Sequence, residues 1–241
     1  MNFWKGKIAV VTGASAGIGA NVLIDLAKNG ITAIGFARRQ DRVEEISKKN
    51  SGLPAKIIAR ECDVSNIDSI KSAFEWVEKT YGGIDILINN AGTFRESRCL
   101  DPLDNTQDMK DVIDTNFTGA VVAAKLAYLS MARRDAYGYI VNINSVNGHT
   151  TAVPFTMNVY TPTKWAITAL TDTLRRETNQ LMNRKVRISS VSPGCVKTEI
   201  HLAAGSSGDF FDVVPHLTPQ DISNQIMYLL SQPPNVYVTS L

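Results

Sequence analysis

The chain has 241 residues, of which 44% are hydrophobic and 20% are charged, and its formal net charge is +2. This composition is typical of a globular protein, and the length favours one α/β domain over residues 1–241 with a sizeable core. The small net charge and scattered Lys and Arg residues argue against a nucleic-acid surface, and no apolar run approaches the ~18 residues that a transmembrane helix needs.

The N-terminal segment and the cysteines bear on the cellular compartment. The first residues, MNFWKGK, lead directly into an apolar run without the hydrophobic region and cleavage site of a signal peptide. The three cysteines, Cys62, Cys99 and Cys195, are odd in number and lack the spacing of metal ligands. We therefore expect a cytoplasmic protein with neither a disulfide framework nor a metal site.

Short apolar runs of strand length recur between longer segments of helical period. They cover Ile8–Val11, Ile31–Phe36, Ile57–Ala59, Ile84–Ile88, Tyr139–Ile143 and Val186–Val191. This alternation predicts βαβ units. Because each run is nearly apolar throughout, we expect a doubly wound, mostly parallel sheet with helices on both faces.

Two of the intervening helices have recognisable ends. The first begins at Gly17, carries an apolar stripe and ends before Gly30, which suits a C-terminal cap. Further along, Ser65–Asp68 resembles a capping box that opens another helix, and the glycine pair starting at Gly82 ends it. A Gly/Ser-containing stretch at 203–209 predicts a loop.

A glycine-rich turn, Thr12–Gly19, joins the first run to the first helix. Glycines permit close backbone approach and a helix N-terminus favours negative charge, so the segment suits a pyrophosphate. The spacing G-x-x-x-G-x-G differs from the usual dinucleotide pattern, and a turn that only packs helix against strand is an alternative; no P-loop lysine follows. The expected cofactor contacts are Gly13, Ser15, Ala16, Gly17, Ile18 and Gly19.

The second run ends in Ala37-Arg38-Arg39, where an NAD enzyme usually has an acidic residue that holds the ribose 2′-hydroxyl. Guanidinium groups instead suit a 2′-phosphate, which favours NADP(H) over NAD(H). The alternative is a solvated arginine pair, and the nearby acids Asp41 and Glu44 weigh against the phosphate site. We nevertheless place Glu44 with the arginines in the predicted cofactor site.

Three more motifs follow: Asn89–Gly92 (NNAG) after the fourth run, Tyr160–Lys164 (YTPTK), and Pro193–Gly194 after the sixth run. With the glycine turn, these motifs and their order make the chain resemble the short-chain dehydrogenase/reductase family over nearly its whole length. The resemblance implies a Rossmann fold and an oxidoreductase with a nicotinamide cofactor. It agrees with the preference for NADP(H) drawn from the arginines.

The resemblance also implies the rest of the cofactor site. Asp63 would face the adenine ring with Val64 nearby, although a turn or capping carboxylate is an equal alternative. The segment after the sixth run would lie beside the nicotinamide. The other implied contacts are Asn90, Ala91, Gly92, Tyr160, Lys164, Pro193, Gly194, Val196 and Thr198.

Tyr160 and Lys164 are four residues apart in a helical segment, so their side chains share one face. A nearby ammonium lowers a tyrosine pKa, ordinarily about 10, which brings proton transfer nearer to working pH. Alone, the two residues would be an ordinary surface pair; the resemblance makes Tyr160 the catalytic acid/base, with Lys164 also holding the nicotinamide ribose. Pro162 is tolerated in a first helical turn, so we expect Tyr160 to open the helix.

Two further catalytic residues are expected, Ser145 and Asn116. Ser145 ends the fifth run at the cofactor edge of the sheet, where its hydroxyl can hydrogen-bond the reacting oxygen. It lacks the G-x-S-x-G context of a hydrolase nucleophile, so hydrolysis is set aside. Asn116 matches the family's fourth catalytic residue, which helps to order the lysine; in isolation it would indicate a helix interruption.

Segment 199–217 corresponds to a substrate lid, and Leu202, Phe210 and Phe211 in it favour an apolar substrate. Within the family, the arginine pair, the end of the fifth run and the length are most similar to insect farnesol dehydrogenases and animal dehydrogenase/reductase member eleven. This similarity implies a small lipophilic substrate of isoprenoid, retinoid or steroid type. The chain stops at Leu241, where relatives usually continue through a final strand and tail.

We therefore predict hydride transfer between NADP(H) and a carbonyl or alcohol carbon. A catalytically weak NADP-binding regulatory protein of the same fold is the alternative, which the presence of all four catalytic residues disfavours. A sugar-nucleotide epimerase or dehydratase would need a longer chain. Segments Ala120–Met131 and Trp165–Leu174 are apolar on more than one face. Relatives pair through the equivalent helices, so the resemblance implies a homodimer or homotetramer.

Overall fold

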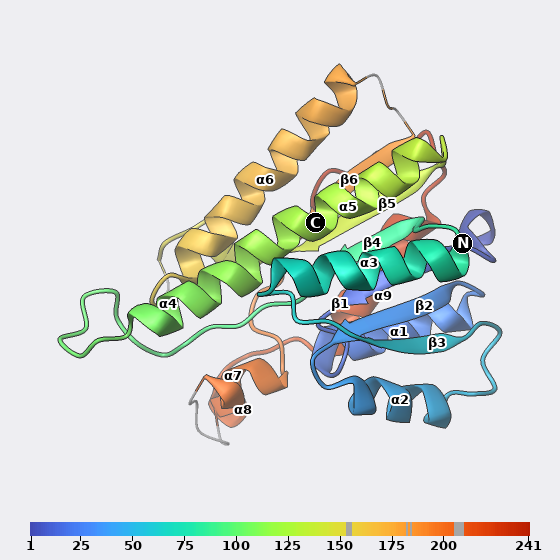
Figure 1. Cartoon of the computed structure of the whole chain (residues 1–241). Coiled ribbons are helices and arrows are strands. Elements are labelled where there is room, and N and C mark those ends of the chain that lie inside the picture. Colours follow the sequence, from blue (N-terminus) through green and yellow to red (C-terminus); the bar gives the residue numbers. More distant parts are fainter. Residues whose placement is uncertain (153–155, 182, 184, 205–209) are drawn as a thin grey trace.

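The computed structural model describes residues 1–152, 156–181, 183, 185–204 and 210–241. Its parallel sheet has the strand order β3-β2-β1-β4-β5-β6 (Figure 1). The strands are β1 (Ile8–Thr12), β2 (Thr32–Ala37), β3 (Ile57–Glu61), β4 (Ile86–Asn89), β5 (Gly138–Ile143) and β6 (Val186–Val191). The chain moves outward from β1 to β3 and then from β4 to β6 on the other side, which confirms the predicted doubly wound Rossmann fold.

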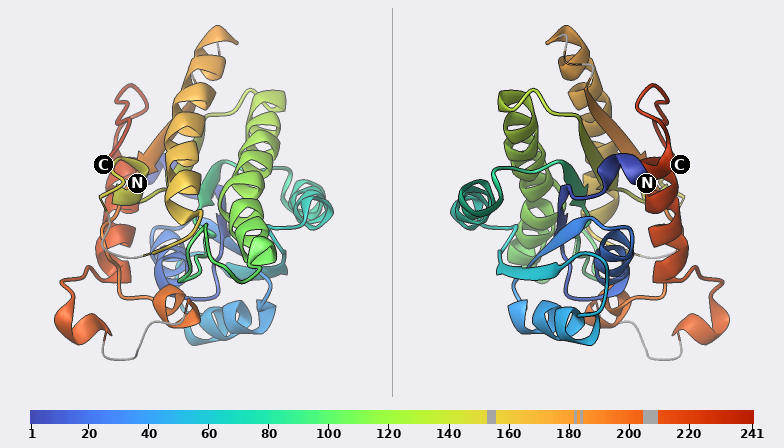
Figure 2. Two further views of the ribbon diagram at one scale, coloured as in Figure 1. Left: turned by 90° about the vertical axis from the view of Figure 1, so that its left-hand side faces the viewer. Right: turned by 90° about the vertical axis from the view of Figure 1, so that its right-hand side faces the viewer.

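Helices cover both faces of the sheet (Figures 1 and 2). One face carries α1 (Gly17–Lys28), α2 (Gln40–Lys49) and α9 (Pro219–Ser231), and the other carries α3 (Ile67–Tyr81), α5 (Gly119–Arg133) and α6 (Tyr160–Gln180). The shorter elements are η1 (Asn2–Trp4), α4 (Thr106–Ile113), η2 (Asp114–Thr118), η3 (Val146–Gly148), α7 (Glu199–Ala203) and α8 (Phe210–Val213). None of the helices in the described part of the chain is long and apolar enough to span a bilayer.

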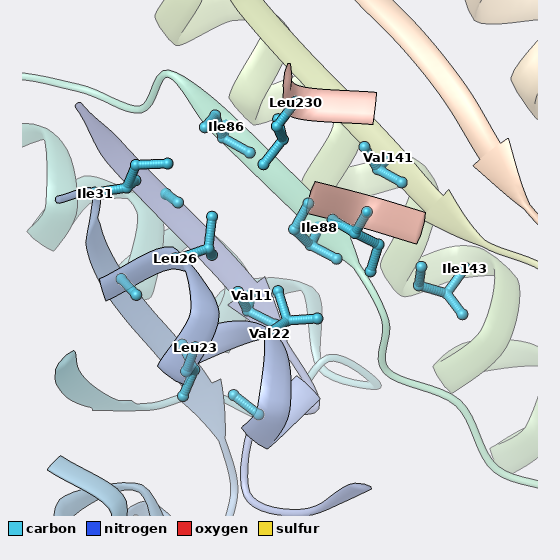
Figure 3. Close-up of a cluster of buried hydrophobic side chains, with 14 of the residues drawn as sticks. Val11, Val22, Leu23, Leu26, Ile31, Ile86, Ile88, Val141, Ile143 and Leu230 are labelled. Carbon is cyan, nitrogen blue, oxygen red and sulfur yellow. The ribbon is translucent and has the colours of Figure 1, made fainter. Parts of the chain in front are cut away.

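A hydrophobic cluster on each face fixes the helices to the sheet. On the first face, Val22 and Leu26 of α1 lie over Val11 and Ile88 of the central strands, and Leu230 of α9 joins them (Figure 3). All five side chains are fully buried or nearly so. Burial of this apolar surface is the main favourable contribution to folding, and it fixes α1 and α9 against the central strands.

Two strands begin later than the apolar runs that predict them. Ile31 and Ile84 are fully buried but precede β2 and β4. The backbone N–H of Ile31 donates to the carbonyl of Leu26 at the end of α1 (3.1 Å), and that of Ile84 donates to Ser130 Oγ (3.0 Å). Apolar runs therefore extend beyond the strands because burial does not require pairing within the sheet.

The capping box predicted at Ser65–Asp68 is wrong. Asn66 is the N-cap of α3, and its side-chain oxygen accepts hydrogen bonds from the backbone N–H groups of Asp68 (2.9 Å) and Ser69 (3.0 Å). The Ser65 hydroxyl donates instead to the Asp63 carboxylate (2.7 Å). Asparagine is at least as good an N-cap as serine. Asp63, two residues before Ser65, accepts the hydrogen bond of the serine hydroxyl, so this hydroxyl does not cap the helix.

The C-terminal residues lie beside β6. Ser240 pairs in parallel with Ser190, and the backbone N–H of Leu241 donates to the Ser190 carbonyl (3.1 Å). The preceding segment is held by Arg187, whose guanidinium donates to the Val236 carbonyl (3.0 Å). The final residues thus form an isolated bridge to β6, outside the six-stranded sheet.

Candidate active site

A cavity of ≈ 960 Å³ opens at the carboxyl ends of the strands. Its walls come from the β1–α1 turn, the segments that follow β2 to β6, the first turn of α6 and α7. Every predicted site residue lines this cavity except Gly19, Glu44 and Asn116. The sheet therefore brings motifs that are far apart in the sequence to the edge where doubly wound folds bind ligands.

The glycine turn presents bare backbone to the cavity. Gly13 has φ +64°, and a Cβ there would come within 2.8 Å of the Ala91 Cα. Gly17 has φ +54°, and a Cβ would lie 2.9 Å from Thr198 Cγ2. Both positions therefore require glycine. Gly19 has a packing role, because a Cβ would lie 2.6 Å from the Gly13 carbonyl oxygen.

The motif after β4 is fastened to the glycine turn. Thr12 Oγ1 accepts hydrogen bonds from the backbone N–H groups of Asn90 and Ala91, each at 3.0 Å. The Asn90 side-chain amide donates to the carbonyls of Thr12 (2.9 Å) and Gly13 (3.2 Å). These four hydrogen bonds make the two segments one continuous wall.

Arg38 and Arg39 are exposed at the rim of the cavity, directly after β2. Arg39 Nη2 lies 3.4 Å from Ser15 Oγ, above the glycine turn. Ala37, which occupies the position where an NAD-binding acid is expected, is buried. Glu44 lies exposed on α2 and does not reach the cavity, so the structure does not bring it together with the other predicted cofactor residues.

Asp63 and Val64 line the cavity after β3. The Asp63 carboxylate accepts hydrogen bonds from Ser65, from the backbone N–H at 2.9 Å and from Oγ at 2.7 Å. Asp63 therefore serves the turn before α3 and faces the cavity as well, and the two roles suggested by the sequence are compatible.

The segment after β6 is fixed at both ends. The Pro193 carbonyl accepts a hydrogen bond from the Val146 backbone (2.9 Å), and Val196 pairs in parallel with Leu217. Gly194 and Thr198 line the cavity between and after these contacts. This wall is therefore shaped by backbone contacts to η3 and to the chain before α9.

Lys164 is only 6% exposed, and its Nζ donates to the carbonyl of Ile143 at the end of β5 (2.9 Å). Burial lowers the pKa of Lys164 to about 8, because the charged ammonium loses its hydration. Its Nζ lies 5.6 Å from the centre of the Tyr160 ring, so the predicted four-residue spacing does bring the pair together.

Tyr160 is the first residue of α6, as the position of Pro162 predicts. Burial raises the pKa of Tyr160 to about 12, and a hydrogen bond with Ser145 partly lowers it. This direction is opposite to that expected from the spacing with Lys164, because the loss of water around a phenolate is the largest influence on this pKa. Tyr160 is therefore protonated at neutral pH and is a proton donor.

Ser145 is 8% exposed and follows β5. Its Oγ caps η3 by accepting a hydrogen bond from the Asn147 backbone (3.1 Å) and also bonds with the Tyr160 side chain. The cap orients the serine, so that the two hydroxyls meet at one point of the cavity. An oxygen atom placed there can accept hydrogen bonds from both.

Asn116 is buried in the π-helical turn η2, which lies between α4 and α5 in one continuous helical stretch. Its side-chain oxygen accepts from the Thr93 backbone N–H (2.8 Å), and its Nδ2 donates to the Thr93 carbonyl (2.9 Å) and Thr163 Oγ1 (3.1 Å). The asparagine thus joins the segment after β4 to the residue next to Lys164.

A series of aromatic side chains extends from Tyr160 to the 199–217 segment. The Phe94 ring centre lies 5.7 Å from that of Tyr160 and 5.3 Å from that of His201. His201 in turn lies 5.2 Å from Phe211. Burial lowers the pKa of His201, because the charged imidazolium loses hydration. The predicted contributions of the Leu202 and Phe210 side chains, and of 205–209, lie outside the described residues.

The sequence was compared with known protein families. The family model described as short chain dehydrogenase matches residues 7–207, which include every predicted site residue. The chain belongs to the short-chain dehydrogenase family. It is therefore an oxidoreductase.

Relatives within the short-chain dehydrogenase family span nearly the whole chain. A farnesol dehydrogenase of Aedes aegypti is 44% identical, over 100% of this chain and 96% of its own length. Dehydrogenase/reductase SDR family member 11 of Gallus gallus is 34% identical, over 99% and 95%. An alcohol dehydrogenase of Thermococcus sibiricus, solved in complex with 5-hydroxy-NADP, has a TM-score of 0.82 at 28% identity, covering 98% and 94%. The predicted similarity to insect farnesol dehydrogenases and to animal dehydrogenase/reductase member eleven is confirmed.

Four residues near the predicted site were not singled out from the sequence: Phe94, Glu199, His201 and Arg42. Phe94 follows the family's Asn89–Gly92 motif by two residues, so its position at the carboxyl edge of the sheet could have been predicted from that motif. Arg42, Glu199 and His201 lie near the site because of contacts between residues far apart in the sequence, and no local sequence pattern predicts such contacts.

Proposed function

We propose that this short-chain dehydrogenase uses NADP(H) to interconvert a carbonyl and an alcohol on a small lipophilic substrate. The observation that carries the proposal is the convergence of Tyr160, Ser145 and Lys164 on the cavity across from the glycine turn. Two hydrogen-bonded hydroxyls form a site for one oxygen atom, and the buried amine lies beside it.

The cavity fits NADP(H) at both ends of the ADP portion. Bare backbone at Gly13 and Gly17, beside the N-terminus of α1, suits a pyrophosphate. Arg38 and Arg39 suit a 2′-phosphate, and Ala37 offers no acid that would repel it. The cavity volume of ≈ 960 Å³ is near the upper end of the roughly 300–1,000 Å³ of small-molecule sites. The NADP derivative bound by the Thermococcus relative supports this choice.

When bound, the nicotinamide supplies or accepts the hydride. The protein's own residues manage the oxygen atom and its proton. In the direction of reduction, Tyr160 gives its hydroxyl proton to the carbonyl oxygen, and Ser145 donates a hydrogen bond to the same atom. Lys164, whose pKa is about 8, is largely an ammonium at neutral pH and stabilises the phenolate that remains. Asn116 is a positioning residue.

Ile200 and His201 line the cavity near Tyr160, and Arg95 and Asp111 add polar groups to the lining. The buried Phe94 ring lies behind this lining, against the rings of Tyr160 and His201, and the three rings form an aromatic wall. This wall suits a hydrocarbon chain or ring next to the reacting carbon. The farnesol dehydrogenase relative supports an isoprenoid alcohol or its carbonyl. We assign the role of a substrate lid to the described residues 199–204 and 210–217.

The test is the loss of NADPH absorbance with farnesal, retinal and a ketosteroid, each measured for wild type and Tyr160→Phe. We expect at least one substrate to turn over and Tyr160→Phe to lower kcat by about 10²- to 10⁴-fold with unchanged NADP⁺ binding. Tyr228→Phe, on the half-exposed Tyr228 of α9, is the matched control and should retain full activity. Unchanged turnover in Tyr160→Phe would refute the assigned role.

A comparison of NADPH with NADH tests the cofactor. We expect kcat/KM to favour NADPH by at least about tenfold, because one charge-assisted phosphate contact contributes this much. Equal values would remove the argument from Arg38 and Arg39. Tight NADP⁺ binding without turnover of any substrate would instead favour the regulatory protein.

A further inference from the structure

Glu199 joins the 199–217 segment to the rim of the cofactor cavity. It is the first residue of α7, and its carboxylate contacts Arg39 at 3.3 Å and Arg42 at 2.8 and 3.0 Å. Figure 2 shows the orange α7 next to the light-blue α2, which carries Arg42. Arg39 follows β2 and Arg42 lies on α2, and both contact Glu199, which lies in the segment after β6, the strand at one edge of the sheet.

The cluster is readily rearranged. The side chains of Arg39, Arg42 and Glu199 are 50%, 42% and 53% exposed, and ion pairs in such surroundings are weak. Arg39 also reaches the glycine turn, with Nη2 3.4 Å from Ser15 Oγ. Its guanidinium therefore lies between the carboxylate of Glu199 and the turn that suits the cofactor phosphates.

We propose that Glu199 competes with the 2′-phosphate of NADP(H) for Arg39 and thereby limits the preference of this protein for NADP(H) over NAD(H). This inference rests on the proposed function, in which Arg38 and Arg39 bind that phosphate. When the phosphate engages Arg39, Arg42 retains Glu199 through its closer contact. NAD(H) has no 2′-phosphate and leaves the Glu199–Arg39 pair in place.

Glu199 and the 2′-phosphate compete for Arg39 because both are negatively charged. A phosphate monoester carries about −1.5 to −2 at pH 7, and a carboxylate on the same guanidinium repels it. A guanidinium also forms its strongest hydrogen bonds when it binds one anion in a bidentate manner, so it does not bind two anions equally well at once. Removing the carboxylate therefore relieves a repulsion and makes the whole of Arg39 available to the phosphate.

The experiment measures Kd for NADP⁺ and NAD⁺ by isothermal titration calorimetry on wild type and Glu199→Gln. We expect Glu199→Gln to lower the Kd of NADP⁺ by about two- to fivefold, as an exposed ion pair allows, and to leave the Kd of NAD⁺ unchanged. The difference should shrink at about 1 M salt, where the screening length falls to about 3 Å.

Glu45→Gln is the matched control, because it removes one negative charge from α2 at a residue that pairs with Lys49 rather than with the arginines. Its NADP⁺ affinity should equal that of wild type. In an Arg39→Gln background, Glu199→Gln should change NADP⁺ affinity less than it does in wild type, as expected for two residues that act mainly through one contact.

The outcomes separate this inference from the proposed function. If wild type binds NADP⁺ no better than NAD⁺, the assignment of Arg38 and Arg39 fails. If wild type prefers NADP⁺ but Glu199→Gln leaves the preference unchanged or weakens it, the assignment stands and competition is refuted. An equal gain for both cofactors would also refute it, because the effect would then not depend on the 2′-phosphate.

Discussion

Lys164 is a buried ammonium whose stabilising contacts are few for its charge. It is 6% exposed, and the carbonyl of Ile143 accepts its one hydrogen bond among the described residues. The fall of its pKa from 10.5 to about 8 means that folding must hold a poorly hydrated cation at neutral pH. Active-site groups of this kind often lower the stability of the folded protein and are kept because the activity requires them.

Replacing Lys164 with methionine should stabilise the protein while abolishing turnover. The variant should gain about 1–3 kcal/mol in the free energy of unfolding at pH 7, because the cost of the buried charge disappears. The folded pKa lies below the unfolded one, so the cost is complete below pH 8 and shrinks toward pH 10.5. Urea denaturation at pH 7 and pH 9.5 measures it; a variant that is less stable at pH 7 would contradict the argument.

Single residues of the site could be predicted from the sequence when a motif carries them. Tyr160, Lys164 and Ser145 all reach the cavity, whereas Glu44 does not. The sign of the Tyr160 pKa shift could not be predicted, because it depends on how completely the ring is buried. Spacing along a helix shows which charges are neighbours but not how much water surrounds them.

At the scale of elements, two glycines show how the turns differ. Gly13 ends β1 with φ +64°, and Gly82 ends α3 with φ +76°. At both positions, a residue with a side chain would raise the free energy of the folded state, because the left-handed backbone conformation is unfavourable for it. Only Gly13 faces a close neighbour, since no described atom lies within 4 Å of a Cβ at Gly82 and the Ala91 Cα lies 2.8 Å from one at Gly13.

Gly13→Ala should therefore destabilise the protein more than Gly82→Ala. Both variants should lose about 1 kcal/mol to backbone strain, and Gly13→Ala should lose at least about 1–2 kcal/mol more because backbone must move. Chemical denaturation of the two variants gives the difference directly. Gly82→Ala should retain wild-type NADP⁺ affinity, and equal destabilisation of the two would show that the turn can yield at Ala91.

Which elements form could be predicted, but their detailed ends could not. All six apolar runs became strands, and the glycine at 82 ends α3 as expected. The competition between Ser65 and Asn66 for the cap of α3 was decided by Asp63, which takes the serine hydroxyl. Likewise, the contact of α7 with α2 joins residues about 157 apart in sequence, beyond the range of any local pattern.

At the scale of the whole molecule, α5 and α6 leave apolar side chains outside the core. Leu129 of α5 is 38% exposed and Trp165 of α6 is 44% exposed, and both helices lie on one face of the sheet (Figure 2). We propose that residues 1–241 form one domain that pairs with a second copy through these helices. A surface of this kind gains most when a partner covers it.

Leu129→Asp should weaken this association. Light scattering coupled to size exclusion should give a dimer or tetramer for wild type and a smaller mass for Leu129→Asp at micromolar concentration, because a buried carboxylate is costly in an interface. Leu100→Asp changes a leucine that is 94% exposed in the segment before α4, and it is the matched control. A monomeric wild type would refute the proposed pairing.

The hydrogen bonds between Thr12 and Asn90 link the two halves of the sheet at the place where the dinucleotide should lie. A ligand held by both halves binds only when both are folded, so it adds RT ln(1 + [L]/Kd) to stability, about 2.7 kcal/mol at 100 times Kd. We expect NADP⁺ to raise the calorimetric melting temperature in one cooperative transition. A second transition that does not respond to NADP⁺ would show halves that melt separately. A single transition would mean that the free concentration of cofactor shifts the folding equilibrium of both halves together.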